Sequence, residues 1–298
     1  MLKYLSYSII TIFFISAITR CANVTAPTGG PKDTIPPSMV NSIPLNKSIN
    51  FKDNTIYLEF DERIKEDKLK DQLIITPVIT GKYENTIKKN LFKMTFDEPF
   101  ADSTTYTLNF REGIQDISES NPSLTNKFTF STGSFIDSLT VYGLTTNLLN
   151  SDTIENAIVG LFRVEDTVNI FNGSPYYFSQ TDEKGYYSIE NIKNGKYIAA
   201  AFTDTNKNLK LDFKSESYAF KKDTLVLDSI PIELNFKLYK LDITPFRQTT
   251  ALPTGIYYEI NFNKYVIDFI QNPIDTTTQK LYANLSKQNK SIRFYNAI

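Results

Sequence analysis

Hydrophobic and polar residues alternate along most of the chain between residues 38 and 132. In the stretch TIYLEF the alternation puts Ile56, Leu58 and Phe60 on one side, because successive side chains of a β-strand point to opposite faces. The stretches LFKMTF, TYTLNF and KFTFST repeat the pattern, with inward residues Phe92, Met94, Phe96, Tyr106, Leu108, Phe110, Phe128 and Phe130. Strands of this kind, separated by short polar turns, predict an antiparallel β-sandwich.

Two charged segments, DERIKEDKLKDQ and REGIQDISESNP, separate these strands. Their composition predicts turns, each with room for one short helical turn.

A second region of alternation begins near Asp137 and is centred on TDEKGYYSIENIKNGKYIAAAF. Gly185 lies in a turn where it is free to take a positive φ, and Tyr187 and Ile189 alternate into a core. Asn194 and Gly195 predict a tight hairpin turn before a returning strand. The other strands of this module are expected to contain Tyr142, Val159, Leu161, Phe162, Ile232, Leu234, Phe236 and Leu238.

The C-terminal part repeats the N-terminal pattern. The segment YYEINFNKYV, residues 257–266, aligns with IYLEFDERI, so that Ile260 matches Leu58 and Phe262 matches Phe60. This self-similarity predicts a further β module. The segment from 242 to 298 is short for a whole sandwich, so we expect a partial or truncated module.

The first 20 residues have the pattern of an export signal. Lys3 is followed by the apolar run LSYSIITIFFISAI and then by Cys21, the only cysteine of the chain. The run is shorter than the roughly 20 residues of a membrane span and precedes polar, proline-rich sequence, which predicts a signal peptide at 1–20. The next segment, ANVTAPTGGPKDTIPP, lacks apolar periodicity and predicts an extended tether at 21–37.

The composition excludes several classes of function. The chain has no histidine, which excludes Ser-His-Asp and Cys-His catalysis and histidine-ligated metals. A single cysteine cannot form an intramolecular disulfide or a thiolate cluster. The formal net charge of −1 provides no basic surface for nucleic acid. We therefore expect no binding of nucleic acid, and the chemistry that remains open is that of carboxylates and of cations bound by oxygen ligands.

A cysteine directly behind such a leader resembles the bacterial lipoprotein signal. The resemblance implies that Cys21 is lipidated and becomes the N-terminus of a membrane-anchored protein outside the cytoplasm. Arg20 stands where the lipoprotein pattern has Gly, Ala or Ser, so an uncleaved N-terminal anchor is the alternative. The residues after Cys21 contain no acidic cluster resembling a surface-export signal, which favours the periplasmic face of the outer membrane over the cell surface.

Two modules resemble known families. The segments PTGGPKDTIPP, SIPLNKSINFKDNTIYLEFDERI, TYTLNFREGIQDISESNP and FTFSTG together resemble the S-layer-type bacterial Ig-like domain of exported lipoproteins. The centre of the second module resembles the transthyretin-like (prealbumin-like) sandwich of carboxypeptidase regulatory and Cna-B-type domains. The expected fold is all-β: a lipoprotein signal peptide and tether, an Ig-like sandwich at 38–133, and a transthyretin-like sandwich at 137–241. The family resemblance implies scaffold or spacer functions.

One segment has the spacing of a calcium loop. In FTDTNKNLKLDF, oxygen ligands alternate at Asp204, Asn206, Asn208, the carbonyl of Lys210, and Asp212. Leu209 replaces the glycine of the sharp bend, and Glu216 comes one residue late for the last ligand. The prediction is a structural calcium site, and the alternative is a polar turn between strands.

A recurring tripeptide, Asp followed by Ser or Thr and then an aliphatic residue or Thr, resembles the acceptor pattern of periplasmic O-glycosylation. Its hydroxyls are Thr34, Ser103, Ser138, Thr153, Thr167, Thr224, Ser229 and Thr276. The alternative is that the tripeptide is a common way for a turn to enter a strand.

Two further patterns have plain structural explanations. The acidic pairs Asp61–Glu62 and Asp97–Glu98 are expected to be solvated turn charges, because neighbouring residues on a strand point to opposite faces. The aromatic residues 176–178 could stack on a sugar or a partner, but an ordinary buried strand is favoured.

The sequence thus predicts a non-enzymatic cell-envelope lipoprotein whose β-sandwiches form a scaffold or interaction surface. The first alternative is a surface lipoprotein that binds a glycan or another protein, in the manner of an adhesin. The second is an enzyme whose catalytic part lies beyond the chain.

Overall fold

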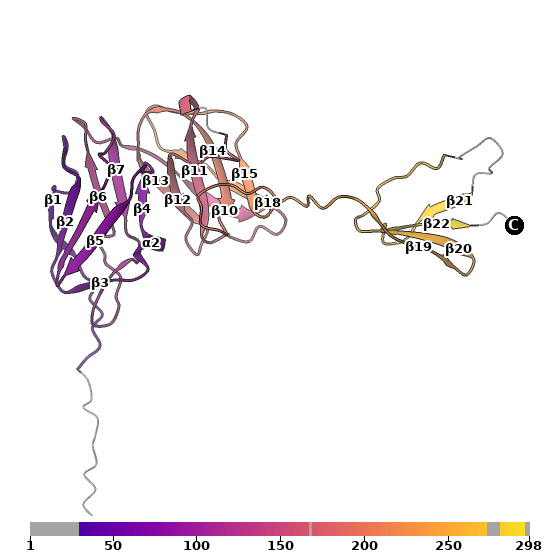
Figure 1. The fold of residues 1–298 in the computed structure, drawn as a ribbon, viewed down its shortest axis with the longest axis horizontal. Helices are drawn as coiled ribbons and strands as arrows, with labels where there is room; N and C mark the ends of the chain where they lie inside the picture. Colours follow the sequence, from indigo (N-terminus) through magenta and orange to yellow (C-terminus); the bar gives the residue numbers. More distant parts are fainter. Residues whose placement is uncertain (1–29, 167–168, 273–280, 296–298) are drawn as a thin grey trace, which may run out of the picture. The chain divides into compact units, whose positions relative to one another are not determined.

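The computed structural model describes residues 30–166, 169–272 and 281–295 (Figure 1). The chain divides into two compact units, one comprising residues up to Ser138 together with 190–193, and the other comprising 139–189 and 194–298. The predicted signal peptide and Cys21 lie outside the described residues. The part of the chain that is described contains no helix with the length and apolar character needed to cross a membrane.

The first unit contains nine short strands and one helical turn. They are β1 (Met39–Ile43), β2 (Thr55–Phe60), β3 (Ile64–Glu66), α2 (Leu69–Gln72), β4 (Ile74–Thr76), β5 (Tyr83–Lys88), β6 (Leu91–Phe96), β7 (Thr105–Asn109), β8 (Ile114–Asp116) and β9 (Lys127–Ser131). The strands form a four-stranded sheet in the order β1-β2-β6-β5, a three-stranded sheet β4-β7-β9, and a pair β3-β8. All of these pairings are antiparallel.

The predicted inward residues of the first unit form its core. All eleven are buried in one hydrophobic cluster, because alternate side chains of facing sheets meet in the space between them. Strands β7 and β9 also bury their other face, where Thr107 and Thr129 are buried and their hydroxyl oxygens lie 3.3 Å apart. The side chain of Asn191 donates a hydrogen bond to the Thr107 hydroxyl at 2.8 Å. The predicted all-β sandwich fold is confirmed.

The first charged segment contains the predicted helical turn, α2, together with β3. The second contains strand β8 and a turn but no helix, so the helical turn predicted there is wrong. The reason is the pairing of Ile114–Asp116 with β3, which places Ile114 in the core.

The second unit contains the second region of alternation. Its elements are β10 (Leu139–Asn147), β11 (Ala157–Arg163), the 3-10 turn η1 (Val164–Asp166), β12 (Tyr177–Gln180), β13 (Tyr186–Ile192), β14 (Gly195–Thr203), β15 (Ser217–Phe220), β16 (Leu225–Leu227), β17 (Ile232–Glu233) and β18 (Phe236–Lys240). They form a nine-stranded sheet with the main order β12-β11-β14-β15-β18-β10-β13. Tyr187 and Ile189 are buried and Gly185 has a φ of 73°, as predicted. In β10, Val141 is fully buried, whereas Tyr142 is only half-buried.

The hairpin predicted at Asn194 and Gly195 is wrong. Strands β13 and β14 follow each other in sequence but are not neighbours, since β13 lies beside β10 and β14 lies between β11 and β15. Residues 199–202 of β14 are all fully buried, so both faces of the strand are covered. A strand that is buried on both faces favours a central place in a sheet, and this outweighs the local turn signal.

The C-terminal part forms a four-stranded antiparallel sheet. Its strands are β19 (Gln248–Thr254), β20 (Tyr257–Phe262), β21 (Tyr282–Leu285) and β22 (Ser291–Tyr295), in the order β19-β20-β22-β21 (Figure 1). Among the described residues of this sheet and its connections, only Val266, Ser291 and Ile292 are buried. Both faces of the sheet therefore remain partly open.

Candidate functional site

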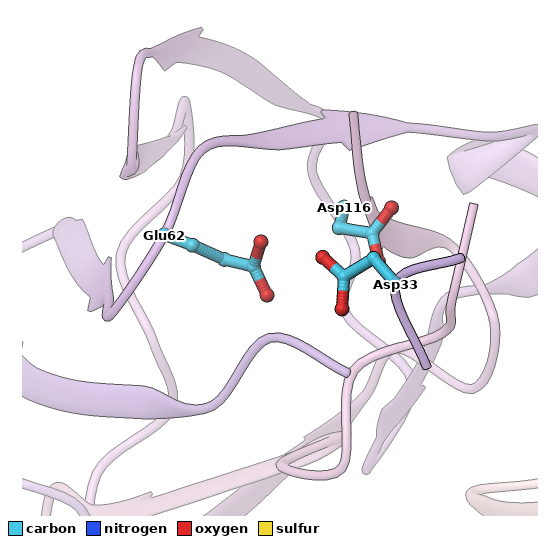
Figure 2. Close-up of side chains that lie close together, drawn as sticks. All are labelled: Asp33, Glu62 and Asp116. Atoms are coloured by element: carbon cyan, nitrogen blue, oxygen red, sulfur yellow. The ribbon is translucent and has the colours of Figure 1, made fainter. Parts of the chain in front are cut away.

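Three carboxylates from distant parts of the sequence meet in the first unit (Figure 2). Asp33 comes from the N-terminal segment, Glu62 from the turn after β2, and Asp116 from the end of β8. One oxygen of each lies within 4.8 Å of one oxygen of the other two. In the described part of the chain this is the only group of three acidic side chains, here called the acidic cluster, that meets this distance.

Asp116 is the fully buried member of the cluster. Its Oδ1 accepts hydrogen bonds from the backbone N–H groups of Glu119 and Ser120, at 2.8 and 2.9 Å. Its Oδ2 accepts a third from Asn121 Nδ2 at 2.7 Å. Burial acts to raise the pKa of Asp116, but these hydrogen bonds outweigh it and the net pKa is lowered. Asp116 is therefore an ionised residue that fixes the turn from 116 to 121.

Asn121 also connects the turn to the N-terminal segment, because its Nδ2 donates to the carbonyl oxygen of Asp33 at 3.1 Å. Ser123 Oγ donates to the carbonyl oxygen of Pro37 at 2.9 Å, and Asp61 Oδ1 accepts the N–H of Ser38 at 2.8 Å. The described end of the predicted tether, from Asp33 to Pro37, is thus hydrogen-bonded to the first unit.

The acidic cluster changes the pKa of Glu62. Its pKa is raised, first by burial and then by repulsion from Asp116, Asp33 and Asp61. The oxygen atoms of Glu62 and Asp33 are hard ligands of the kind that Ca²⁺ and Mg²⁺ prefer, while the oxygens of Asp116 are already used by three hydrogen bonds. The expectation that Glu62 is a simple solvated turn charge overlooked this cluster.

The predicted calcium loop connects β14 and β15. Asp204 Oδ1 accepts the N–H of Asn208 at 3.0 Å, and its Oδ2 accepts the N–H of Leu209 at 2.8 Å. Leu209 has a φ of 55°, so this residue makes the bend that a glycine would make more easily.

The other predicted ligands of the loop have similar roles. Asn206 Oδ1 accepts the N–H of Asn208 at 3.2 Å, and Asn208 Oδ1 accepts the N–H of Lys210 at 2.8 Å. The pKa of Asp212 is lowered, mainly by hydrogen bonds from the side chain of Ser215 and the backbone of Lys214.

Glu216 closes the loop and is 1% exposed. Its Oε1 accepts the N–H of Thr205 and its Oε2 accepts the N–H of Asp212, both at 2.9 Å. The two ends of the loop are thus held together by one buried carboxylate. This bonding favours the polar-turn alternative, while calcium binding at the loop stays a prediction.

The proposed O-glycosylation hydroxyls lie mostly at the surface. Six of them are in described residues and all six are exposed: Thr34, Ser103, Ser138, Thr153, Thr224 and Ser229. Thr167 and Thr276 lie outside the described residues. The aspartate before Ser138 is buried, and its Oδ2 accepts a hydrogen bond from Thr105 at 2.8 Å.

The aromatic segment at 176–178 is the buried strand that the sequence favoured. Tyr177 and Phe178 are buried in β12, and Tyr176 lies under the guanidinium of Arg163 at 3.8 Å. The rings of Tyr177 and Phe178 are therefore not available as a binding platform, whereas Tyr176 precedes the strand and is half-buried.

A comparison with known protein families finds a match that coincides with the first unit. Residues 33–132 match the bacterial Ig-like domain family. The match begins at Asp33, where the chain starts to hydrogen-bond with the sandwich.

Solved structures show weaker likenesses. The chain is 12% identical to BcpA, the major pilin subunit of Bacillus cereus, over 70% of this chain and 71% of that one, with a TM-score of 0.25. It is 14% identical to the group B streptococcus pilus 2b backbone protein, over 63% and 94% of the chains, with a TM-score of 0.22. An L,D-transpeptidase from Mycobacterium smegmatis is 12% identical over 49% and 77%, with a TM-score of 0.23. These TM-scores are too low to support statements about function. The comparison with curated proteins gives no match.

Replacing Glu62 by Gln should stabilise the first unit at neutral pH. A carboxyl whose pKa is raised by folding disfavours the folded state once it is ionised, and this penalty appears as the pH rises from the unfolded value through the folded one. Glu62→Gln should therefore raise the free energy of unfolding at pH 7 by up to about 1 kcal/mol, with no gain well below pH 4. Urea unfolding between pH 3 and pH 8 measures this.

Glu84→Gln on strand β5 is the matched control, because it removes an exposed carboxylate of the same unit. An equal effect of both substitutions would contradict repulsion within the acidic cluster. So would a loss of stability in Glu62→Gln that appears only with Ca²⁺, since the three carboxylates would then share a cation.

Replacing Glu216 by Gln should destabilise the second unit by about 1 to 3 kcal/mol, because one of two backbone N–H groups loses a charged acceptor in a buried place. On the polar-turn interpretation, the loss should be equal in calcium and in chelator. Thermal melts in both buffers, with the exposed Glu183→Gln as control, measure it. A calcium-dependent rise in the melting temperature that Asp204→Asn abolishes would instead establish the predicted calcium site.

Proposed function

We propose that the protein is a non-enzymatic lipoprotein of the cell envelope, held at the outer membrane by Cys21. Its β-sandwich units serve as a scaffold or interaction surface, on the periplasmic face in preference to the cell surface. The observation that carries the proposal is that the segment from Asp33 to Pro37 is hydrogen-bonded to the first unit, which matches the Ig-like family. A folded module therefore begins 12 positions after the proposed lipidation site.

The length of the connection supports a scaffold close to the membrane. Twelve residues reach at most about 40 Å when fully extended. The tether therefore lets the first unit stand clear of lipid headgroups but keeps it within the envelope. Several acyl chains on Cys21 would hold it far more firmly than the marginal binding of a single chain.

The acidic cluster does not favour an enzyme. Glycosidases use two carboxyl groups about 5 to 10 Å apart on either side of an accessible substrate. Asp116, in contrast, is fully buried and uses both oxygens for hydrogen bonds within its own turn. It is not available to accept a proton from a substrate or from water.

A second candidate function is recognition of a glycan or a protein at the surface. It is favoured by a face of the C-terminal sheet on which tyrosine rings lie next to a charged pair.

Lipid attachment at Cys21 is testable by mass spectrometry of the mature protein from membranes. We expect an N-terminal peptide that starts at Cys21 and carries a diacylglyceryl group, and we expect Cys21→Ala to be recovered without lipid and outside the membrane fraction. Unmodified Cys21 within an intact N-terminus, still in the membrane, would support the uncleaved anchor and contradict lipidation.

We further propose that the exposed hydroxyls of the Asp-Ser/Thr tripeptides carry O-linked sugars. In protein exported by a Gram-negative host, glycan mass should be found on the peptide containing Thr224 and should disappear in Asp223→Ala as well as in Thr224→Ala. Thr254, exposed but preceded by proline, is the matched hydroxyl and should remain unmodified. Equal modification of both threonines, or of neither, would contradict the proposal.

A further inference from the structure

The C-terminal sheet presents one face on which tyrosine side chains lie in line across three strands. The register sets Tyr257 of β20 opposite Tyr295 of β22, and Tyr295 opposite Tyr282 of β21. Residues that are directly opposite on antiparallel strands share a face. The ring centroids are 5.5 Å apart for Tyr257 and Tyr295 and 5.7 Å apart for Tyr282 and Tyr295, with interplanar angles of 56° and 48°. These three residues are called the tyrosine row.

A row of hydrogen-bonding groups lies next to it on the same face. Two residues along each strand from the tyrosines, the register places Glu259, Arg293 and Asn284 in line. The guanidinium of Arg293 lies 4.8 Å from the centre of the Tyr257 ring, and its Nε donates to Glu259 Oε1 at 2.8 Å. Ser291 Oγ donates to the same oxygen at 2.8 Å.

The ion pair between Arg293 and Glu259 is held in place, and some of its hydrogen-bonding atoms are left for a ligand. The recorded hydrogen bonds of the pair within the described residues involve Arg293 Nε and Glu259 Oε1. Glu259 Oε2 is then an acceptor, and the two Nη groups of Arg293 are donors, for a bound molecule. The side chains keep access to solvent, since Arg293 is 35% and Glu259 19% exposed. Tyr282, at the end of the tyrosine row, is 67% exposed.

The opposite face of the sheet has a different character. It carries Tyr258, which is 43% exposed, together with Ile260, Phe262, Ile292 and Phe294, and aromatic residues from the connecting segments pack on it. Phe246 stacks on Phe262 at 5.0 Å, and Phe269 contacts Phe294 at 6.4 Å. That face serves packing within the chain. The face with the tyrosine row combines rings with a charged pair, which is unlike a core.

We propose that the face formed by Tyr257, Tyr282, Tyr295, Glu259 and Arg293 binds a neutral oligosaccharide. One side of a pyranose ring presents C–H groups, and these are attracted to the electron-rich face of an aromatic ring. The rim presents neighbouring hydroxyls, each of which donates and accepts. Glu259 Oε2 accepts from one hydroxyl while an Nη group of Arg293 donates to the next, and both are charge-assisted hydrogen bonds.

The net charge of this face favours neutral over charged sugars. Glu259 and Arg293 neutralise each other in a direct ion pair, so the face has no net charge to attract a uronic acid or a phosphorylated sugar. This inference rests on the second candidate function, recognition of a glycan, and names the class of sugar. It is independent of the proposed scaffold function, which is tested at Cys21 and not at this face.

Isothermal titration calorimetry on the full-length protein tests the inference. The probes are hexasaccharides of glucose in β-1,4 and α-1,4 linkage, mannose, xylose and N-acetylglucosamine. At least one should bind, and Tyr282→Ala should weaken its affinity about tenfold, the factor expected for the loss of one aromatic contact. Tyr282→Phe should keep the affinity, because the ring remains. Arg293→Lys should weaken it, because a lysine lacks the second donor of the guanidinium fork.

The matched control is Tyr265→Ala, since Tyr265 is 69% exposed, lies in the same part of the chain and is not in the tyrosine row. This variant should bind as the unchanged protein does. The inference is overturned if none of the five probes binds, or if Tyr265→Ala and Tyr282→Ala weaken binding equally. It is also overturned if sedimentation shows a dimer that Tyr282→Ala dissociates while no probe binds, because the face would then be a protein contact.

Discussion

The packing of aromatic rings between the sheets of the first unit is the interaction on which the rest of that unit depends. Phe130 lies 4.9 Å from both Phe51 and Phe100, and Tyr106 stacks on it at 5.6 Å. Phe100 belongs to no strand, yet it also contacts Phe96 at 4.7 Å, so the loop before β7 is part of the core. A large ring buried on all sides contributes several kcal/mol, because its removal would leave a cavity in addition to the lost transfer energy. This core fixes the ends of the strands from which Glu62 and Asp116 extend.

Buried carboxylates fix loops in both units by the same physical means. A buried charge is costly unless hydrogen bonds replace its water, and backbone N–H groups in a tight turn supply such bonds at fixed positions. Asp116 does this for the turn after β8, and Glu216 does it for the loop between β14 and β15. Glu216 follows the loop that the sequence predicted to bind calcium, whereas Asp116 had no expected role beyond its place in a turn. Their hydrogen bonds show a structural role.

The strands could be predicted because apolar residues at every second position are buried on one face of a strand. Phe92, Met94 and Phe96 are an example, since all three lie in the core. The partners of a strand were less predictable. The Asn194–Gly195 turn signal is local, whereas the position of β14 depends on burial of both its faces against β11 and β15. The acidic cluster could not be inferred at all, because Asp33, Glu62 and Asp116 are far apart in sequence and meet only after the sandwich has formed. The tyrosine row could not be inferred either, because it depends on the register of β20, β22 and β21, and alternation along one strand does not determine which residues of its neighbours lie opposite.

The alternation that builds a core elsewhere has a different consequence in the C-terminal sheet. In the first unit, a strand such as β6 has an apolar, buried inner face, and its outer face carries the smaller or polar set Leu91, Lys93 and Thr95. In β20, both faces carry large aromatic residues, with Tyr257 on one and Tyr258 on the other. Within the described residues, the rings from the connecting segments pack on one of these faces, at Phe262 and Phe294. An aromatic surface next to a charged pair suits a ligand that has both apolar and hydroxyl surfaces. This exposed combination distinguishes the C-terminal sheet from the first unit, where most aromatic residues are buried in the core.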